Sequence, residues 1–213
     1  MTGGDSLTVA RLRASLADTT LPREPTRVVL PPHADRMPQD MLKRLTRALR
    51  PAAVLIPVIE RKPHLSVLLT RRSAELTHHA SQIAFPGGRM DPDDTDIEQT
   101  ALRETAEEVG IAAEAVSVIG YLEPMPTVTG YAVTPVVGVI EPPVDIVIDR
   151  REVDVAFEVP LPFLFEPDNA RHTMRPFRGS RIPTVEFHFG GHRIWGATAN
   201  MLVSLRDKVI NNK

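Results

Sequence analysis

Three glutamates within five positions, Glu104, Glu107 and Glu108, form the clearest chemical pattern in this chain. In a helix, at about 100° per residue, Glu104 and Glu108 lie on the same face and Glu107 lies on the adjoining flank. Like charges at this spacing repel each other, so a purely structural helix gains nothing from them. A hard divalent cation such as Mg²⁺ favours carboxylate oxygens and bridges readily to phosphate. The cluster therefore indicates either a metal site for phosphate chemistry or a solvated acidic face.

The residues on either side of the glutamates predict a helix with defined ends, over residues 96–109. Thr95 and Glu98 have the spacing of a capping box, with Thr95 as N-cap. Gly110 supplies a left-handed C-terminal stop. Arg103 stands four residues before Glu107, where it can orient that carboxylate.

A short glycine segment precedes this helix. Phe85-Pro86-Gly87-Gly88 is predicted to be a strand end that breaks into a glycine turn. Glycine lets a backbone approach a ligand closely, although a tight turn alone would use the same residues. The short distance to the acidic helix favours the first interpretation.

Taken together, residues Gly88–Ile111 resemble the signature of the Nudix hydrolases. That signature has a glycine, five residues, an acidic residue, a spacer, and then Arg-Glu-x-x-Glu-Glu-x-Gly-aliphatic. In this chain Asp94 stands where glutamate is usual, one additional residue separates it from Arg103, and Thr105 replaces a more apolar residue. The additional residue is expected in the loop before the helix, where it leaves the three glutamates undisturbed.

The resemblance implies a catalytic set and a metal. Glu104, Glu107 and Glu108 would hold Mg²⁺ or Mn²⁺, with Arg103 beside them, for hydrolysis of a phosphoanhydride. The general base is either one of these glutamates or an acid from residues 145–158. Glu152 is the candidate from that stretch, and an exposed loop glutamate is the equally weighted alternative.

Residues 68–88 resemble the motif that precedes the signature in coenzyme A pyrophosphatases, with departures at Thr77 and Ser81. This resemblance implies substrate contacts for Arg72, His79, Gly87 and Gly88. It also implies cleavage of CoA or acyl-CoA to 3′,5′-ADP and (acyl-)phosphopantetheine. The alternatives are another nucleoside diphosphate derivative, such as ADP-ribose, NADH or a dinucleotide, and a catalytically silent nucleotide-binding regulator. The intact glutamate cluster argues against the silent regulator.

Composition agrees with a small-molecule enzyme in the cytoplasm. Lysine and arginine total 25 against 27 acidic residues, so no net basic charge favours nucleic acid. The absence of cysteine excludes disulfides and thiol catalysis. No apolar run approaches the ~18 residues of a membrane span, so no membrane association is expected.

Two parts are expected along the chain: an N-terminal helical and extended appendage over residues 1–50, and a Nudix body over residues 51–213. Helical spacing appears at 6–17 and again at 38–50. The basic amphipathic helix at 38–50 is expected to pack against the body or against a second subunit in a homodimer, and membrane binding is the less favoured alternative. The body alternates β-rich runs with one central helix and a last helix at 198–209. The expected fold is therefore an α/β (α+β) class Nudix-type α/β/α sandwich with a mixed sheet.

Overall fold

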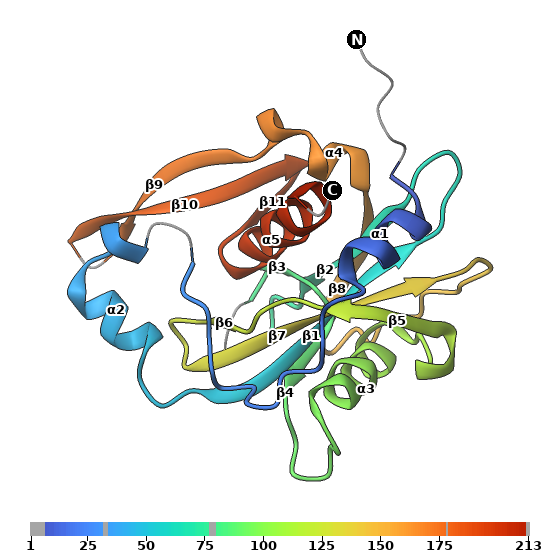
Figure 1. The fold of residues 1–213 in the computed structure, drawn as a ribbon, viewed down its shortest axis with the longest axis horizontal. Helices are drawn as coiled ribbons and strands as arrows, with labels where there is room; N and C mark the ends of the chain where they lie inside the picture. Colours follow the sequence, from blue (N-terminus) through green and yellow to red (C-terminus); the bar gives the residue numbers. More distant parts are fainter. Residues whose placement is uncertain (1–6, 32–33, 77–79, 178, 212–213) are drawn as a thin grey trace.

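The computed structural model describes residues 7–31, 34–76, 80–177 and 179–211, and Figure 1 shows their arrangement. A large mixed sheet runs in the order β3-β2-β1-β7-β5, with β4 on β1, β6 on β7 and β8 on β2. The strands of this sheet have the following bounds: β1 Arg50–Ile59, β2 Ser66–Arg72, β3 Ile83–Ala84, β4 Gly87–Arg89, β5 Val116–Tyr121, β6 Met125–Pro126, β7 Tyr131–Ile140 and β8 Val153–Pro160.

The centre of the sheet is the parallel pair β1 and β7, which stay in register from Arg50↔Tyr131 to Ile59↔Ile140. Both strands are nearly continuous runs of buried residues. Such runs are typical of strands that are covered on both faces.

Helices cover both faces of the sheet, so the sandwich expected from the resemblance is confirmed (Figure 1). Helix α3 (Ile97–Val109) lies on one face, where Ile97 and Ala101 are buried with residues of β1 and β7. Helices α1 (Val9–Leu16) and α5 (Ala197–Asn211) lie on the other face and share the main core.

A second, antiparallel sheet, in the order β11-β10-β9, packs over the face that carries α5. Its strands are β9 (Arg171–Phe177), β10 (Ser180–Phe189) and β11 (His192–Trp195). The β9–β10 hairpin extends beyond the main sheet toward α2 (Gln39–Leu45), as Figure 1 shows. The remaining short elements are α4 (Leu161–Phe165) and the 3₁₀ turns Ala34–Arg36, Ala113–Ala115 and Pro167–Asn169.

The predicted helix over residues 38–50 is wrong at its C-terminal end. Helix α2 ends at Leu45, and Arg50 is already the first residue of β1. Arg50 precedes Pro51, whose ring disfavours the helical conformation in the residue before it. The β1–β7 ladder then takes up Arg50, whose guanidinium stands 4.5 Å from the Tyr131 ring centroid.

Two further local predictions need correction. The N-cap of α3 is Asp96 rather than Thr95, because its carboxylate accepts the Gln99 backbone N–H at 2.9 Å. Gly87 and Gly88 are not a turn but belong to β4, which pairs with β1. The left-handed stop at Gly110 is confirmed, with φ of 72°.

The N-terminal segment shares the main core. Leu12 and Leu16 of α1 are fully buried in the same cluster as residues of α5 and the sheet. Thr8 caps this helix by accepting the Arg11 backbone N–H. The division of the chain at residue 50 stays a prediction, whereas the burial of α1 shows that part of the appendage contributes to the body's core.

Candidate active site

Helix α3 presents its three glutamates to three different environments. The side chain of Glu108 is 2% exposed, that of Glu104 is 15% exposed, and that of Glu107 is 59% exposed. The helical spacing produces this gradient, because Glu104 and Glu108 face the sheet side of the helix while Glu107 points outward. The side chains therefore form a graded cluster from interior to solvent.

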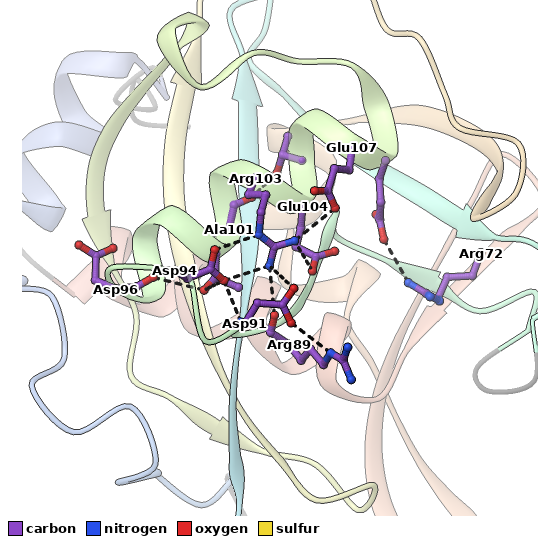
Figure 2. Close-up of polar contacts among 12 residues, drawn as sticks. Arg72, Arg89, Asp91, Asp94, Asp96, Ala101, Arg103, Glu104 and Glu107 are labelled. Atoms are coloured by element: carbon purple, nitrogen blue, oxygen red, sulfur yellow. Dashed lines mark hydrogen bonds and ion pairs between the residues drawn. The ribbon is translucent and has the colours of Figure 1, made fainter.

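Arg103 is the organising cation of this cluster (Figure 2). Its Nη1 donates to Glu104 at 3.0 Å and to Glu107 at 3.2 Å. Its Nε and Nη2 donate to the two oxygens of Asp94 at 2.9 and 3.0 Å. One guanidinium thus links the helix glutamates to the loop before the helix, and the contact expected between Arg103 and Glu107 is present.

Asp94 holds Arg103 in place, a role that the sequence reasoning did not assign. It is buried and also accepts the Thr100 hydroxyl and the Asp91 backbone N–H, both at 2.9 Å. The hydrogen bonds from Arg103 lower the pKa of Asp94 to about 2. The position of Asp94 in the motif could have predicted this contact, because aspartate, although shorter than the usual glutamate, still reaches Arg103.

Glu108 is the most perturbed acid of the site. Burial raises its pKa to about 8, against the opposing charge of Arg72 and with further raising by Glu104 and Glu152. Arg72 Nη1 stands 3.2 Å from Glu108 Oε1. The other carboxylate oxygen, Oε2, is buried and has no hydrogen-bond partner among the described residues.

The glycines of β4 explain how Glu104 reaches its position. A Cβ at Gly88 would overlap the Glu104 carboxylate, and a Cβ at Gly87 would overlap the backbone of β1. Gly88 thus makes room for a glutamate, and Gly87 makes room for the neighbouring strand. Burial also raises the pKa of Glu104, partly offset by Arg103.

Glu152 lies close enough to the cluster for its charge to raise the pKa of both Glu104 and Glu108. It stands just before β8, where its carbonyl accepts the Ser73 backbone N–H at 2.8 Å. The structure therefore brings together Arg72, Arg103, Glu152 and the three glutamates. His79 lies outside the described residues.

The side chains of the cluster fit a divalent cation, although they are not arranged as a finished site. Among the described residues, no three Asp, Glu or His side chains form a ready metal-binding group. The reason is visible in the contacts, because Arg103 engages Glu104 and Glu107 while Arg72 engages Glu108. The unpartnered Glu108 Oε2 and the mutual repulsion of buried carboxylates are what a hard cation would relieve.

A cavity of about 530 Å³ adjoins the cluster, and Arg72 and Gly87 form part of its lining. Its wall also includes residues of α2, β1, β3, the segment from β6 to β7, the β9–β10 hairpin, and the junction of β11 with α5. This volume is in the range of small-molecule sites. The sequence alone does not reveal the cavity, because its lining is gathered from segments spread along the chain.

Comparisons with known proteins agree with this architecture. The family model described as the NUDIX domain matches residues 49–178. A Photorhabdus laumondii protein named "Uncharacterized Nudix hydrolase NudL" is 42% identical over 167 residues, which are 78% of this chain and 89% of that protein. A Salmonella newport protein of the same name is 43% identical over 157 residues, or 73% of this chain and 81% of the relative.

Among solved structures, the binary complex of a C. elegans Ap4A hydrolase has a TM-score of 0.45 at 22% identity, covering 54% of this chain and 82% of the other. The family match and the NudL relatives place the chain plainly: it belongs to the Nudix family and is a hydrolase of pyrophosphate bonds. Nudix hydrolases generally use divalent cations such as Mg²⁺ or Mn²⁺. In the part of the chain that the structure describes, no helix is both long and apolar enough to cross a membrane.

Proposed function

We propose that this protein is a metal-dependent pyrophosphatase that cleaves CoA or acyl-CoA into 3′,5′-ADP and (acyl-)phosphopantetheine. One observation supports this proposal above the others: Arg72 and Gly87 both line the cavity, Arg72 forms an ion pair with Glu108, and the Gly87 backbone forms a hydrogen bond with the same carboxylate. Both residues lie in the 68–88 segment that resembles the CoA branch. A phosphoanhydride at the cluster would therefore leave one arm of the substrate in the cavity.

The chemistry needs charge neutralisation on the phosphates, an oriented water and a base. Glu104, Glu107 and Glu108 would hold Mg²⁺ or Mn²⁺, which supplies Lewis-acid polarisation of the phosphoanhydride and lowers the pKa of water. Arg103 donates hydrogen bonds to Glu104 and Glu107 and would hold these carboxylates in position for the ion.

Arg72 forms an ion pair with Glu108 and would donate instead to a phosphate oxygen of the substrate. A carboxylate and a phosphate are both anionic acceptors for a guanidinium. Glu152 is the proposed base for the attacking water. Its place beside Glu104 and Glu108, close enough for its charge to act on both, supports this assignment, because a general base must lie within reach of the water that it activates.

The second candidate is a Nudix pyrophosphatase for another nucleoside diphosphate derivative. It draws on the same cluster, and the resemblance at residues 68–88 favours CoA over it. One assay separates the two candidates. The protein is incubated with CoA, ADP-ribose or NADH in Mg²⁺ or Mn²⁺, and the products are identified by mass spectrometry.

The expected result is cleavage of CoA at its pyrophosphate with a higher kcat/KM than for ADP-ribose. Equal or reversed preference would overturn the CoA assignment and leave the Nudix activity intact. Glu108→Gln is assayed beside the wild type on each substrate. Loss of cleavage in this variant would show that cleavage comes from this site.

A further inference from the structure

The cavity next to the carboxylate cluster has a lining that phosphoanhydride hydrolysis alone does not require. Four of the chain's seven methionines, Met37, Met41, Met125 and Met201, are gathered on its wall. Methionine is unbranched and flexible, so it adapts to apolar ligands of varied shape. A site for a sugar or for phosphates alone would gain little from such a wall.

Part of this wall comes from outside the matched Nudix domain, residues 49–178. Met37 and Met41 precede that range, and Trp195 and Met201 follow it. Met41 is 8% exposed and Met201 is 2% exposed, so the folded structure holds both in place. Segments outside the matched domain therefore contribute to the shape of the cavity.

A cationic side chain also belongs to the lining. The guanidinium of Arg175, from the β9–β10 hairpin, stands 4.0 Å from the ring centroid of Trp195. Its Nη1 is buried without a hydrogen-bond partner among the described residues. Mostly apolar walls with a few placed polar groups are typical of sites that bind an amphipathic ligand.

We infer that this cavity holds the apolar arm of the substrate, and that Met41 of α2 is a specificity-determining residue for that arm. The inference rests on the proposed pyrophosphatase function and adds a preference to it: a substrate with an acyl chain binds more tightly than one without. Arg72 and Gly87 join the cavity to the carboxylate cluster, so one molecule can occupy both.

Trp195 gives a direct measurement of occupancy, because it is the only tryptophan in the chain and lines the cavity. Its fluorescence is followed in the intact protein in EDTA, without turnover, during titration with octanoyl-CoA, CoA, ADP-ribose or octanoyl-pantetheine. Octanoyl-CoA is expected to reach half-saturation at a concentration at least ~10-fold lower than CoA, the scale of a few methylenes in an apolar pocket. Equal half-saturation for octanoyl-CoA and CoA would overturn the inference.

A charge on the wall should remove the preference. Met41→Glu is expected to lower the ratio of kcat/KM for octanoyl-CoA to that for CoA by about 10-fold, because a charge disfavours a neighbouring apolar chain. Met41→Leu should keep the wild-type ratio. Met174→Glu is the matched control, because Met174 is 47% exposed on β9 and is not part of the lining.

Thermal unfolding of each variant shows whether the fold is kept. An unchanged ratio in folded Met41→Glu refutes the role of Met41, and if that variant does not fold, Met41→Ala replaces it in the same comparison with the same expected direction. The proposed function fails separately, through absence of cleavage of CoA and octanoyl-CoA by the wild type. In that case the octanoyl-pantetheine titration still tests the cavity, because that ligand has no phosphoanhydride. A saturable change in Trp195 fluorescence supports binding of the apolar arm there, and no change overturns it.

Discussion

The carboxylate cluster and the adjoining cavity are built in opposite ways. The cluster comes from one helix and the loop before it, and its side chains are fixed by ion pairs such as those of Arg103 with Asp94 and Glu104. The cavity comes from segments spread from Met37 to Met201 and is mostly apolar. A charged site needs fixed distances, which a single helix supplies, whereas an apolar wall needs only shape and volume. We therefore expect catalysis at the cluster and selectivity at the cavity to respond to different substitutions.

Glu108→Gln should have the largest effect on turnover if the cluster is the catalytic part. It keeps the side-chain volume but removes a charged ligand, so kcat should fall by at least ~10²-fold, the scale of losing a major electrostatic contact. Partial recovery at high Mg²⁺ indicates weakened metal occupancy, and no recovery indicates that Glu108 is the base. Glu114→Gln, at an exposed position, is the control. Near-normal turnover of Glu108→Gln at low Mg²⁺ would show that Glu108 is needed neither for metal binding nor for catalysis.

Asp94→Asn should have the next largest effect. Without the Asp94 charge, Arg103 is free to bind Glu104 and Glu107 more closely and to compete with the cation. We expect kcat to fall about 10-fold, the scale of one lost charge-assisted hydrogen bond, and the half-saturating Mg²⁺ concentration to rise. Asp91→Asn is the matched control, because Asp91 stands 3.9 Å from Arg103 and is more exposed. An unchanged Mg²⁺ dependence would mean that Asp94 only stabilises the fold.

Leu12→Ala should lower stability and leave turnover unchanged, in contrast to the two substitutions in the cluster. Leu12 is fully buried in the main core and far from the motif in sequence, so its loss should cost about 2–5 kcal/mol of unfolding free energy. Turnover per folded molecule should stay the same. Val29→Ala is the control, since Val29 is 51% exposed and its truncation should change stability by less than about 0.5 kcal/mol. Denaturant titration and assays well below the unfolding transition measure the two quantities.

The pH dependence of stability in the metal-free protein should give a distinct signature for each acid. The folded-state pKa of Glu108 is about 8, above its ordinary 4.5, so the folded state holds a proton that the unfolded chain has released. The contribution of Glu108 to the free energy of unfolding is therefore present below pH 4.5 and is lost as pH rises toward 8. The pKa of Asp94 is about 2, below its ordinary 3.8, so its contribution is present above pH 3.8 and is lost as pH falls toward 2.

Urea unfolding in EDTA across pH 3–9 measures both contributions. Glu108→Gln should flatten the decline at high pH, and Asp94→Asn should flatten the decline in acid. A decline at high pH that persists in Glu108→Gln would assign it to another group.

The spacing of Glu104, Glu107 and Glu108 determined which faces they occupy, because helical periodicity is a property of the local chain. The left-handed stop at Gly110 also followed from a local residue type, whereas the pairing of β1 with β7 joins segments far apart in the chain. Strand β8 was missed over residues 153–160, although its apolar residues alternate from Val153 to Val159.

Only the tertiary structure decided what each charge contacts. The pairing of Arg72 with Glu108, the approach of Glu152, and the space that Gly88 leaves for Glu104 all join residues far apart in the chain. The same holds for the cavity, whose methionines share no periodicity. Local spacing fixes direction along one helix, whereas burial and its effect on pKa depend on which distant segments cover that helix.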